Sequence, residues 1–374
     1  MITRPLFFIV VIIAFAHILN TKLSSFPRSE NQNKDLFWSA IVCTVLVACT
    51  TITCTEKDSG ILNRNQTNEW KGWMQLVFLL YHYYRATWVY NEVRVLVSCY
   101  VWMTGFGNYI FFTVKKDFSF TRVLTTLIRI NLLTLGLIAV NQTSMMLYYV
   151  VPLHTIFFLT TWATCWVEKV FKRSLLSLGL SLVFLVLVFE WWQPFEKEVA
   201  FRFGLDRYSA WWGMVCARIF LQYKLQKNIQ SALPIVIGLS LCATWFVLWG
   251  HEHDKYVYNP NHPYIVILPI SGYILIRNGH PILRRYYSKA MAWAGDISLE
   301  TYVLQFHMLM CKNAEHILVL VPNMPVFNTV VVSILFFIIS RVVRESTVHI
   351  QSFVKNRLQS RHEYLPVQQS ETKQ

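Results

Sequence analysis

The chain has 374 residues, of which 55% are hydrophobic and only 14% are charged, and its formal net charge is +14. The many long apolar runs exclude a soluble globular protein. Because these runs are continuous, with no alternation of apolar and polar residues, they favour transmembrane helices over the strands of a β-barrel. Lys and Arg cluster between the runs, so we attribute the net charge to cytosolic loops and expect no nucleic acid partner. The sequence therefore predicts an all-α polytopic protein in a lipid bilayer.

The apolar runs predict about twelve transmembrane helices. The first run follows Arg4 and contains a segment that loosely resembles a cleavage site. Two interpretations of this run therefore stay open, a first transmembrane helix and a signal peptide. From residue 114 to residue 290, one set of loops carries most of the Lys and Arg, which places those loops and the C-terminus in the cytosol. The expected spans are 5–20, 36–54, 71–90, 95–113, 121–140, 145–167, 174–192, 208–223, 232–250, 264–279, 297–319 and 326–343.

These spans suggest three regions along the chain. Residues 1–68 form N-terminal membrane spans, residues 69–345 form a multispan core, and residues 346–374 form a basic, partly disordered cytosolic tail. No internal repeat is visible, which argues against a transporter built on inverted repeats.

Lys71 and His82 lie eleven residues apart on the third expected helix. Eleven steps of about 100° return a helix to within about 20° of its start, so both side chains share one face, about 16 Å apart along the axis. A cation at the cytosolic edge and an imidazole deeper in the bilayer suit a site that holds a charged carrier and performs proton chemistry. Ionisable groups inside spans are functional candidates because burying them in lipid is costly.

The segments around this pair are rich in aromatic and small residues. Trp70 fits an interfacial aromatic belt, but a histidine flanked by tyrosines several turns into the helix does not. Gly105 and Gly107, followed by Asn108, end the fourth expected span on the cytosolic side. Two glycines permit close approach of a ligand or of another helix, and both interpretations stay open.

The eleventh expected span carries Glu300, Gln305 and His307 in its cytosolic half. These side chains suit either a functional site or a polar clamp between helices. Ser298, which follows Gly295-Asp296-Ile297, does not match a serine-esterase nucleophile. The eight cysteines form no CxxC pair and the loop 251–254 lacks zinc-helix spacing, so we expect no metal.

The segments Glu69–Gln75, Tyr81–Tyr84, Gly105–Asn108 and Ile297–His307 resemble the multispan domain of the sugar O-acetyltransferases. That family has animal sialate, fungal capsule and plant wall-acetylation members. The Lys-x10-His spacing also resembles the Arg/Lys-x10-His pattern of the broader acyltransferase-3 group. The resemblance implies an acyltransferase-3-like bundle in the Golgi, with acetyl-CoA as the acetyl donor, His82 as the catalytic residue and Lys71 at the coenzyme A end.

The resemblance also implies binding partners, and it shows one way in which this sequence differs from the family. Animal and fungal members carry a luminal esterase-like domain before these helices, and this sequence begins within the membrane region, as expected of a truncated form that uses such a domain in trans. The expected partners are acetyl-CoA, sialic acid or CMP-sialic acid, and the bilayer.

The resulting hypothesis is a membrane enzyme that moves acetyl from cytosolic acetyl-CoA to a sugar hydroxyl, or relays it across the membrane, with His82 as base or acetyl carrier. Two alternatives stay open: a transporter or channel for acetyl-CoA, nucleotide sugar or protons, and an inactive truncated isoform. The expected site comprises catalytic His82, Lys71 and Glu300; donor-binding Lys71, Trp70, Gly105, Gly107 and Asn108; and substrate-binding Arg85, Asn91, Arg94, Gln305 and His307.

Overall fold

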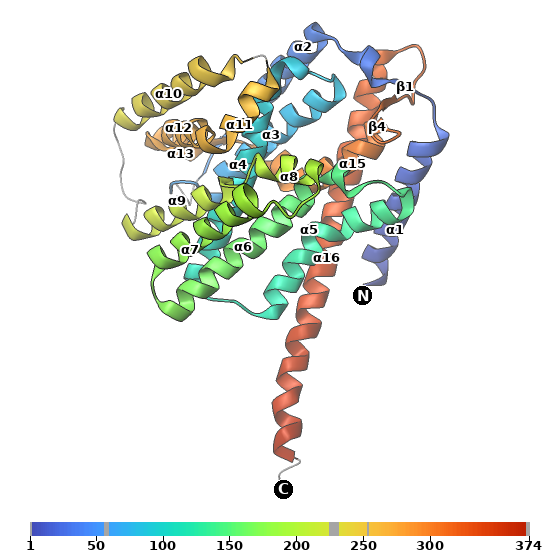
Figure 1. Cartoon of the computed structure of the whole chain (residues 1–374). Coiled ribbons are helices and arrows are strands. Elements are labelled where there is room, and N and C mark those ends of the chain that lie inside the picture. The colour runs from blue at the N-terminus through green and yellow to red at the C-terminus, as the bar shows by residue number, and fades with distance from the viewer. Residues whose placement is uncertain (1, 56–59, 224–231, 253, 372–374) are drawn as a thin grey trace. The chain divides into compact units, whose positions relative to one another are not determined.

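The computed structural model describes residues 2–55, 60–223, 232–252 and 254–371, with side chains described up to residue 359. Helices make up nearly all of its regular structure, and each strand has only two or three residues (Figure 1). The predicted all-α class is confirmed. The chain forms two compact units, the first of residues 1–28, 116–155 and 299–374 and the second of residues 29–115 and 156–298.

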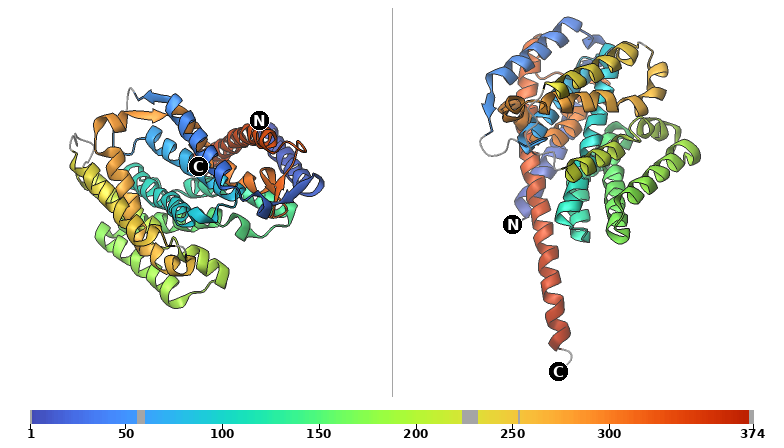
Figure 2. Two further views of the ribbon diagram at one scale, coloured as in Figure 1. Left: turned by 90° about the horizontal axis from the view of Figure 1, so that it is seen from above. Right: turned by 90° about the vertical axis from the view of Figure 1, so that its left-hand side faces the viewer.

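The first unit is built on three long helices that pack against one another: α1 (Thr3–Lys22), α5 (Phe120–Asn141) and α16 (Pro325–Glu371). The C-terminal turns of α16 run on past the ends of the other two helices (Figures 1 and 2). A small antiparallel sheet in the order β1-β5-β4 joins distant segments, with Ser25 opposite Leu318 and Met310 opposite Ile317. Its smaller elements are η3 (Met145–Tyr148), α15 (Ser298–Met308), β1 (Ser25–Pro27), β4 (Met310–Cys311) and β5 (His316–Leu318).

The second unit is a helical bundle with three tight helix pairs, α3 with α14, α4 with α9, and α10 with α12 (Figure 2). The helix α6 (Val150–Phe171) begins in the first unit and ends in the second. The remaining elements are η1 (Arg28–Asn31), α2 (Lys34–Thr50), β2 (Ile52–Cys54), α3 (Arg64–Tyr83), η2 (Thr87–Val89), α4 (Tyr90–Lys115), α7 (Ser174–Val186), η4 (Leu187–Trp192), α8 (Lys197–Gly204), α9 (Ser209–Tyr223), α10 (Leu233–Trp245), η5 (Phe246–Gly250), α11 (Lys255–Ile265), α12 (Ile267–Asn278), α13 (Pro281–Arg285), β3 (Tyr286–Ser288) and α14 (Lys289–Asp296).

Glycines permit the closest of these helix contacts. A β-carbon on Gly72 would lie 1.8 Å from the carbonyl oxygen of Met291, and one on Gly105 would lie 2.0 Å from that of Ala210. No side chain fits at such distances, so the backbones of α3 and α14, and of α4 and α9, touch directly. This packing fixes the position of α3, which carries Lys71 and His82.

Seven helices among the described residues are long and apolar enough to cross a bilayer. The expected total of about twelve stays a prediction, because several other expected spans form shorter or more polar helices: α9 has 15 residues and α12 has 12. The seven are Thr3–Lys22, Thr87–Lys115, Phe120–Asn141, Val150–Phe171, Ser174–Trp192, Leu233–Gly250 and Pro325–Gln359.

The helix α3 is shifted toward the N-terminus relative to the expected span 71–90. It begins after Asn63, whose side chain accepts a hydrogen bond from the backbone N–H of Gln66, and it ends at Tyr83. Arg85 follows with a positive φ of 46°, a conformation that terminates helices. His82 therefore lies in the last turn of α3, whereas the sequence placed it in the middle of a helix.

Candidate functional site

Lys71 and His82 are both half-buried and both lie on α3. An uninterrupted helix between them keeps them on one face at a rise of about 16 Å, as the spacing predicted. The imidazole of His82 meets the rings of Phe78 and Tyr81 edge to face, with centroids 4.4 and 5.2 Å away. These two rings cover part of the imidazole with apolar surface.

The donor-binding residues expected next to Lys71 have mixed surroundings. Trp70 is only 1% exposed, and its ring packs 4.5 Å from that of Tyr273 and 5.9 Å from that of Trp102. It belongs to the hydrophobic core of the second unit. The hydroxyl of Tyr100 donates to the backbone oxygen of Lys71 at 2.5 Å and holds this turn of α3 against α4.

The two glycines of α4 differ in their surroundings. Gly105 touches α9, which matches the helix-packing interpretation left open by the sequence. Gly107 would have no atom within 4 Å of an added β-carbon, so its backbone is accessible. The amide of Asn108 donates to the backbone oxygen of Thr104 at 2.8 Å. A donor-binding role for Gly107 and Asn108 stays a prediction.

The expected substrate-binding residues near the end of α3 split into exposed and buried members. Arg85 is exposed, whereas Asn91 and Arg94 in the first turns of α4 are buried. The amide of Asn91 donates to the backbone oxygens of Trp249, Gly250 and Glu252 at 3.2, 3.3 and 2.8 Å. It thereby fixes the turn that follows η5 to the start of α4.

Arg94 forms a buried ion pair that the sequence did not predict. Its guanidinium lies 2.8 Å from the carboxylate of Asp206, and the two side chains are 7% and 0% exposed. The hydroxyl of Ser98 donates to the same carboxylate and lies 2.9 Å from Nε2 of His262. The hydroxyl of Tyr258 completes the chain at 2.8 Å from Nδ1 of His262. This buried polar network links α4, the turn between α8 and α9, and α11.

Burial determines the protonation tendencies in the network. It raises the pKa of the Asp206 carboxyl against the opposing influence of Arg94, and, together with Arg94, it holds the pKa of His262 well below its usual value. His262 is therefore a neutral hydrogen-bonding group near pH 7. Sequence reasoning missed both residues because each precedes an apolar run, where charged and polar residues usually belong to solvated loops.

The other expected site residues lie on α15 in the first unit. The carboxylate of Glu300 pairs with Arg129 of α5 at 2.7 Å and accepts a hydrogen bond from the hydroxyl of Thr347 of α16 at 3.4 Å. His307 bonds through Nε2 to the hydroxyl of Tyr148. Glu300 thus forms the interhelical polar clamp that the sequence left open.

Gln305 and His307 also retain unused polar atoms. Gln305 donates to the backbone oxygen of Tyr302 at 2.9 Å. Its Oε1 and the Nδ1 of His307 are buried and have no hydrogen-bond partner within the described part of the chain. Because such atoms are costly to bury, a substrate-binding role for these two residues stays a prediction.

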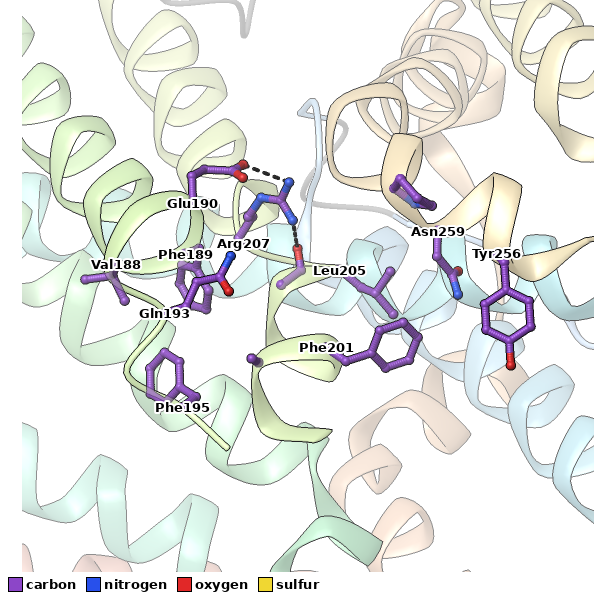
Figure 3. Close-up of a pocket in the computed structure, with 13 residues that line it drawn as sticks. Val188, Phe189, Glu190, Gln193, Phe195, Phe201, Leu205, Arg207, Tyr256 and Asn259 are labelled. Carbon is purple, nitrogen blue, oxygen red and sulfur yellow. Dashed lines mark hydrogen bonds and ion pairs between the residues drawn. The ribbon is translucent and has the colours of Figure 1, made fainter. Parts of the chain in front are cut away.

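A separate pocket of about 350 Å³ opens in the second unit between η4, α8 and α11 (Figure 3). Rings from Phe189, Phe195, Phe201 and Tyr256 line it. Its polar lining includes the ion pair of Glu190 with Arg207, at 2.8 Å. The sequence reasoning did not find this site, because its residues come from segments about sixty positions apart.

Comparison with known proteins places the chain in a family. The family described as "10 TM Acyl Transferase domain found in Cas1p" matches residues 1–190 and 180–363. The chain belongs to this acyltransferase family. It is also 34% identical over 339 residues to an N-acetylneuraminate (7)9-O-acetyltransferase of Danio rerio, an alignment that covers 78% of this chain and 43% of that relative. No solved structure matches the chain.

Two further findings concern the length of the matched relative and metal binding. The chain spans less than half the length of the curated relative that it matches. Among the described residues, no group of three or more His, Cys, Asp or Glu side chains is arranged to hold a metal ion. The predicted multi-pass membrane acyltransferase is confirmed at the level of the family.

Proposed function

We propose that this chain is the membrane part of an O-acetyltransferase that takes acetyl from cytosolic acetyl-CoA and delivers it to a hydroxyl of a sugar, sialic acid or CMP-sialic acid. The family membership supports acyl transfer, and the name of the zebrafish relative supports the sugar. The placement of Lys71 and His82 on one face of α3 is the observation that carries the residue assignment.

In this proposal Lys71 attracts the phosphates of acetyl-CoA from the cytosolic side. An ammonium group is a compact charge that suits phosphate. Gly107 and Asn108 at the cytosolic end of α4 would contribute backbone and amide contacts to the same donor. The one-sided distribution of Lys and Arg in the loops supports this orientation.

His82 performs the proton chemistry. Its imidazole takes the proton of the acceptor hydroxyl while the hydroxyl oxygen bonds to the acetyl carbonyl carbon. The carbon–sulfur bond then breaks, and coenzyme A leaves as the thiol with the proton from the imidazolium. In the relay variant of the proposal, the imidazole nitrogen bonds to the acetyl carbonyl carbon, the carbon–sulfur bond breaks, and coenzyme A leaves as the thiol with the proton of the imidazole N–H. The oxygen of the acceptor hydroxyl then bonds to the acetyl carbon as the nitrogen–carbon bond breaks, and the hydroxyl proton returns to the imidazole.

The rings around His82 support this role physically. Phe78 and Tyr81 lie against the imidazole. Such apolar surface would limit hydrolysis of an acetyl group and strengthen polar contacts to the reacting atoms. Arg85, which is exposed after the end of α3, is proposed to favour an anionic sugar on the luminal side. Arg94 and Glu300 are proposed to act as positioning residues that hold their own helices in place through their ion pairs. We also propose a Golgi location and cooperation with a luminal esterase-like domain.

The test is acetyl-CoA turnover by the purified chain in nanodiscs, with and without sialic acid and with an esterase-like domain added in trans. A positioned base contributes about 10²–10⁴-fold, so His82→Ala should lose at least a hundredfold in rate. Lys71→Ala should mainly raise the KM for acetyl-CoA. The control is His349→Ala, which removes an exposed histidine of α16.

Two results would overturn the proposal. One is wild-type turnover by His82→Ala with folding intact. The other is movement of radiolabelled acetyl-CoA across the membrane without release of free coenzyme A, which would identify a carrier.

A further inference from the structure

The pocket between η4, α8 and α11 combines apolar ring walls with polar edges (Figure 3). Carbon surfaces come from Phe189 of η4, Phe201 of α8 and Tyr256 of α11, and from Phe195 in the segment between η4 and α8. Gln193 and Asn259 add two amides. Sugar rings have one face of C–H groups and a rim of hydroxyls. Aromatic surface beside amide and charged groups is therefore the lining that suits a sugar.

The charged edge of the pocket is held in place by neighbouring tyrosines. Glu190 accepts hydrogen bonds from Tyr208 at 3.0 Å and from Tyr264 at 2.8 Å. Arg207 donates to Tyr264 at 2.9 Å and to the backbone oxygen of Gly204 at 2.8 Å. Because the ion pair is neutral overall and its geometry is preset, it can bind uncharged hydroxyls at little cost in side-chain entropy.

Asn259 presents a hydrogen-bond donor that the described residues do not use. Its Oδ1 accepts from the hydroxyl of Tyr90 at 3.1 Å, whereas its Nδ2 is buried and has no partner within the described ranges. The residue is only 5% exposed, so this donor is costly to leave unsatisfied. Because this atom itself has almost no accessible surface, the amide must turn toward the pocket to bond a ligand oxygen.

The pocket size and its connection to α4 indicate which ligand it takes. A volume of about 350 Å³ lies at the lower end of the range for ligand sites and suits one sugar ring. Tyr90, which bonds Asn259, begins α4 shortly after α3 ends at Tyr83. His82 lies in the last turn of α3. The charge distribution of the loops places this end of α3, together with residues 193–207 and 251–263, on the luminal side.

We propose that this pocket is the acceptor subsite, which binds one sugar ring from the lumen through stacking on the aromatic side chains and through hydrogen bonds to Asn259, Glu190 and Arg207. The inference rests on the proposed function, because it assumes that a sugar is the acetyl acceptor. It adds a site and the kind of contact by which the sugar is recognised.

The test measures sugar binding in the absence of any acetyl donor. The full chain in nanodiscs is titrated with the methyl glycoside of N-acetylneuraminate, and binding is followed by saturation-transfer NMR. Phe201→Ala removes one ring wall and Asn259→Leu removes the unused donor. Each should weaken binding about tenfold, the change expected for loss of one contact of roughly 1.4 kcal/mol.

The control is Phe184→Ala on α7. Phe184 is 53% exposed and Phe201 is 51% exposed, but only Phe201 lines the pocket. The control should bind the sugar as the wild type does. Equal sugar affinity in wild type, Phe201→Ala and Asn259→Leu would overturn the proposal. The absence of any binding at a sugar concentration on the order of 10 mM, which would detect even a weak site, would also overturn it.

Acetyl-CoA turnover separates this inference from the proposed function. Turnover that depends on His82, with sugar affinity insensitive to Phe201 and Asn259, would exclude the pocket and leave the acetyltransferase intact. Sugar binding that depends on these two residues, without any acetyl-CoA turnover, would support the pocket and reject the acetyltransferase.

Discussion

The buried ion pair of Arg94 with Asp206 offers a sharp test of how the second unit is held together. Asp206→Asn leaves the Arg94 charge buried without a counter-charge, and it weakens the acceptor that Ser98 uses. Removal of one partner of a buried pair costs about 3–5 kcal/mol, because the remaining charge keeps its desolvation penalty. We therefore expect Asp206→Asn and Arg94→Met each to lower the free energy of unfolding by that amount.

The chain contains a matched control on α8. Glu198 pairs with Arg202 at 2.7 Å, but these side chains are 54% and 36% exposed. An exposed pair four residues apart on a helix is worth only about 0.3–0.5 kcal/mol, so Glu198→Gln should have roughly a tenth of the effect. Reversible unfolding by SDS in mixed micelles, followed by tryptophan fluorescence, measures both.

A double-mutant cycle completes the test. In Arg94→Met/Asp206→Asn neither charge remains buried, so the double variant should cost at least about 2 kcal/mol less than the sum of the two single variants. If Asp206→Asn is no more destabilising than Glu198→Gln, or if the single effects simply add, the buried network does not stabilise the fold as argued.

Two further predictions address packing and pH. Gly105→Ala should sharply reduce the yield of folded protein in size-exclusion chromatography, because the added β-carbon would meet the backbone of Ala210. Gly107→Ala should be neutral or slightly stabilising, because the space around Gly107 is open. Equal yields of the two variants would reject the close contact of α4 with α9. The neutral His262 makes the free energy of unfolding depend on pH. The pKa of His262 is lowered in the folded protein, so the unfolded chain binds the proton first as the pH falls. The stability that His262 contributes is therefore present above pH 6.5 and is lost as the pH falls below that value. Between pH 7 and pH 5 the wild type should lose up to about 1.4 kcal/mol per pH unit relative to His262→Gln, whereas parallel stability curves would show that His262 is protonated in the folded state. The raised pKa of Asp206 acts in the opposite direction, so only the difference between these two proteins isolates His262.

Some features of the candidate site were predictable because they depend on one helix. The shared face of Lys71 and His82 follows from helical geometry alone, whatever packs around α3. The end of that helix was not predictable. The residues after His82 are compatible with a helix, and only the left-handed conformation of Arg85 and the placement of α4 end it at Tyr83.

The sequence by itself determined the helical membrane class and the pairing of Lys71 with His82, because hydrophobicity and helical period are local properties. The tertiary structure alone decided the partners of the other polar groups. Asp206 meets Arg94 across 112 positions, Ser98 meets His262 across 164, and the pocket draws Phe201 and Asn259 from separate segments. Such partners depend on which helices pack together, and the periodicity of a single helix carries no information about its neighbours.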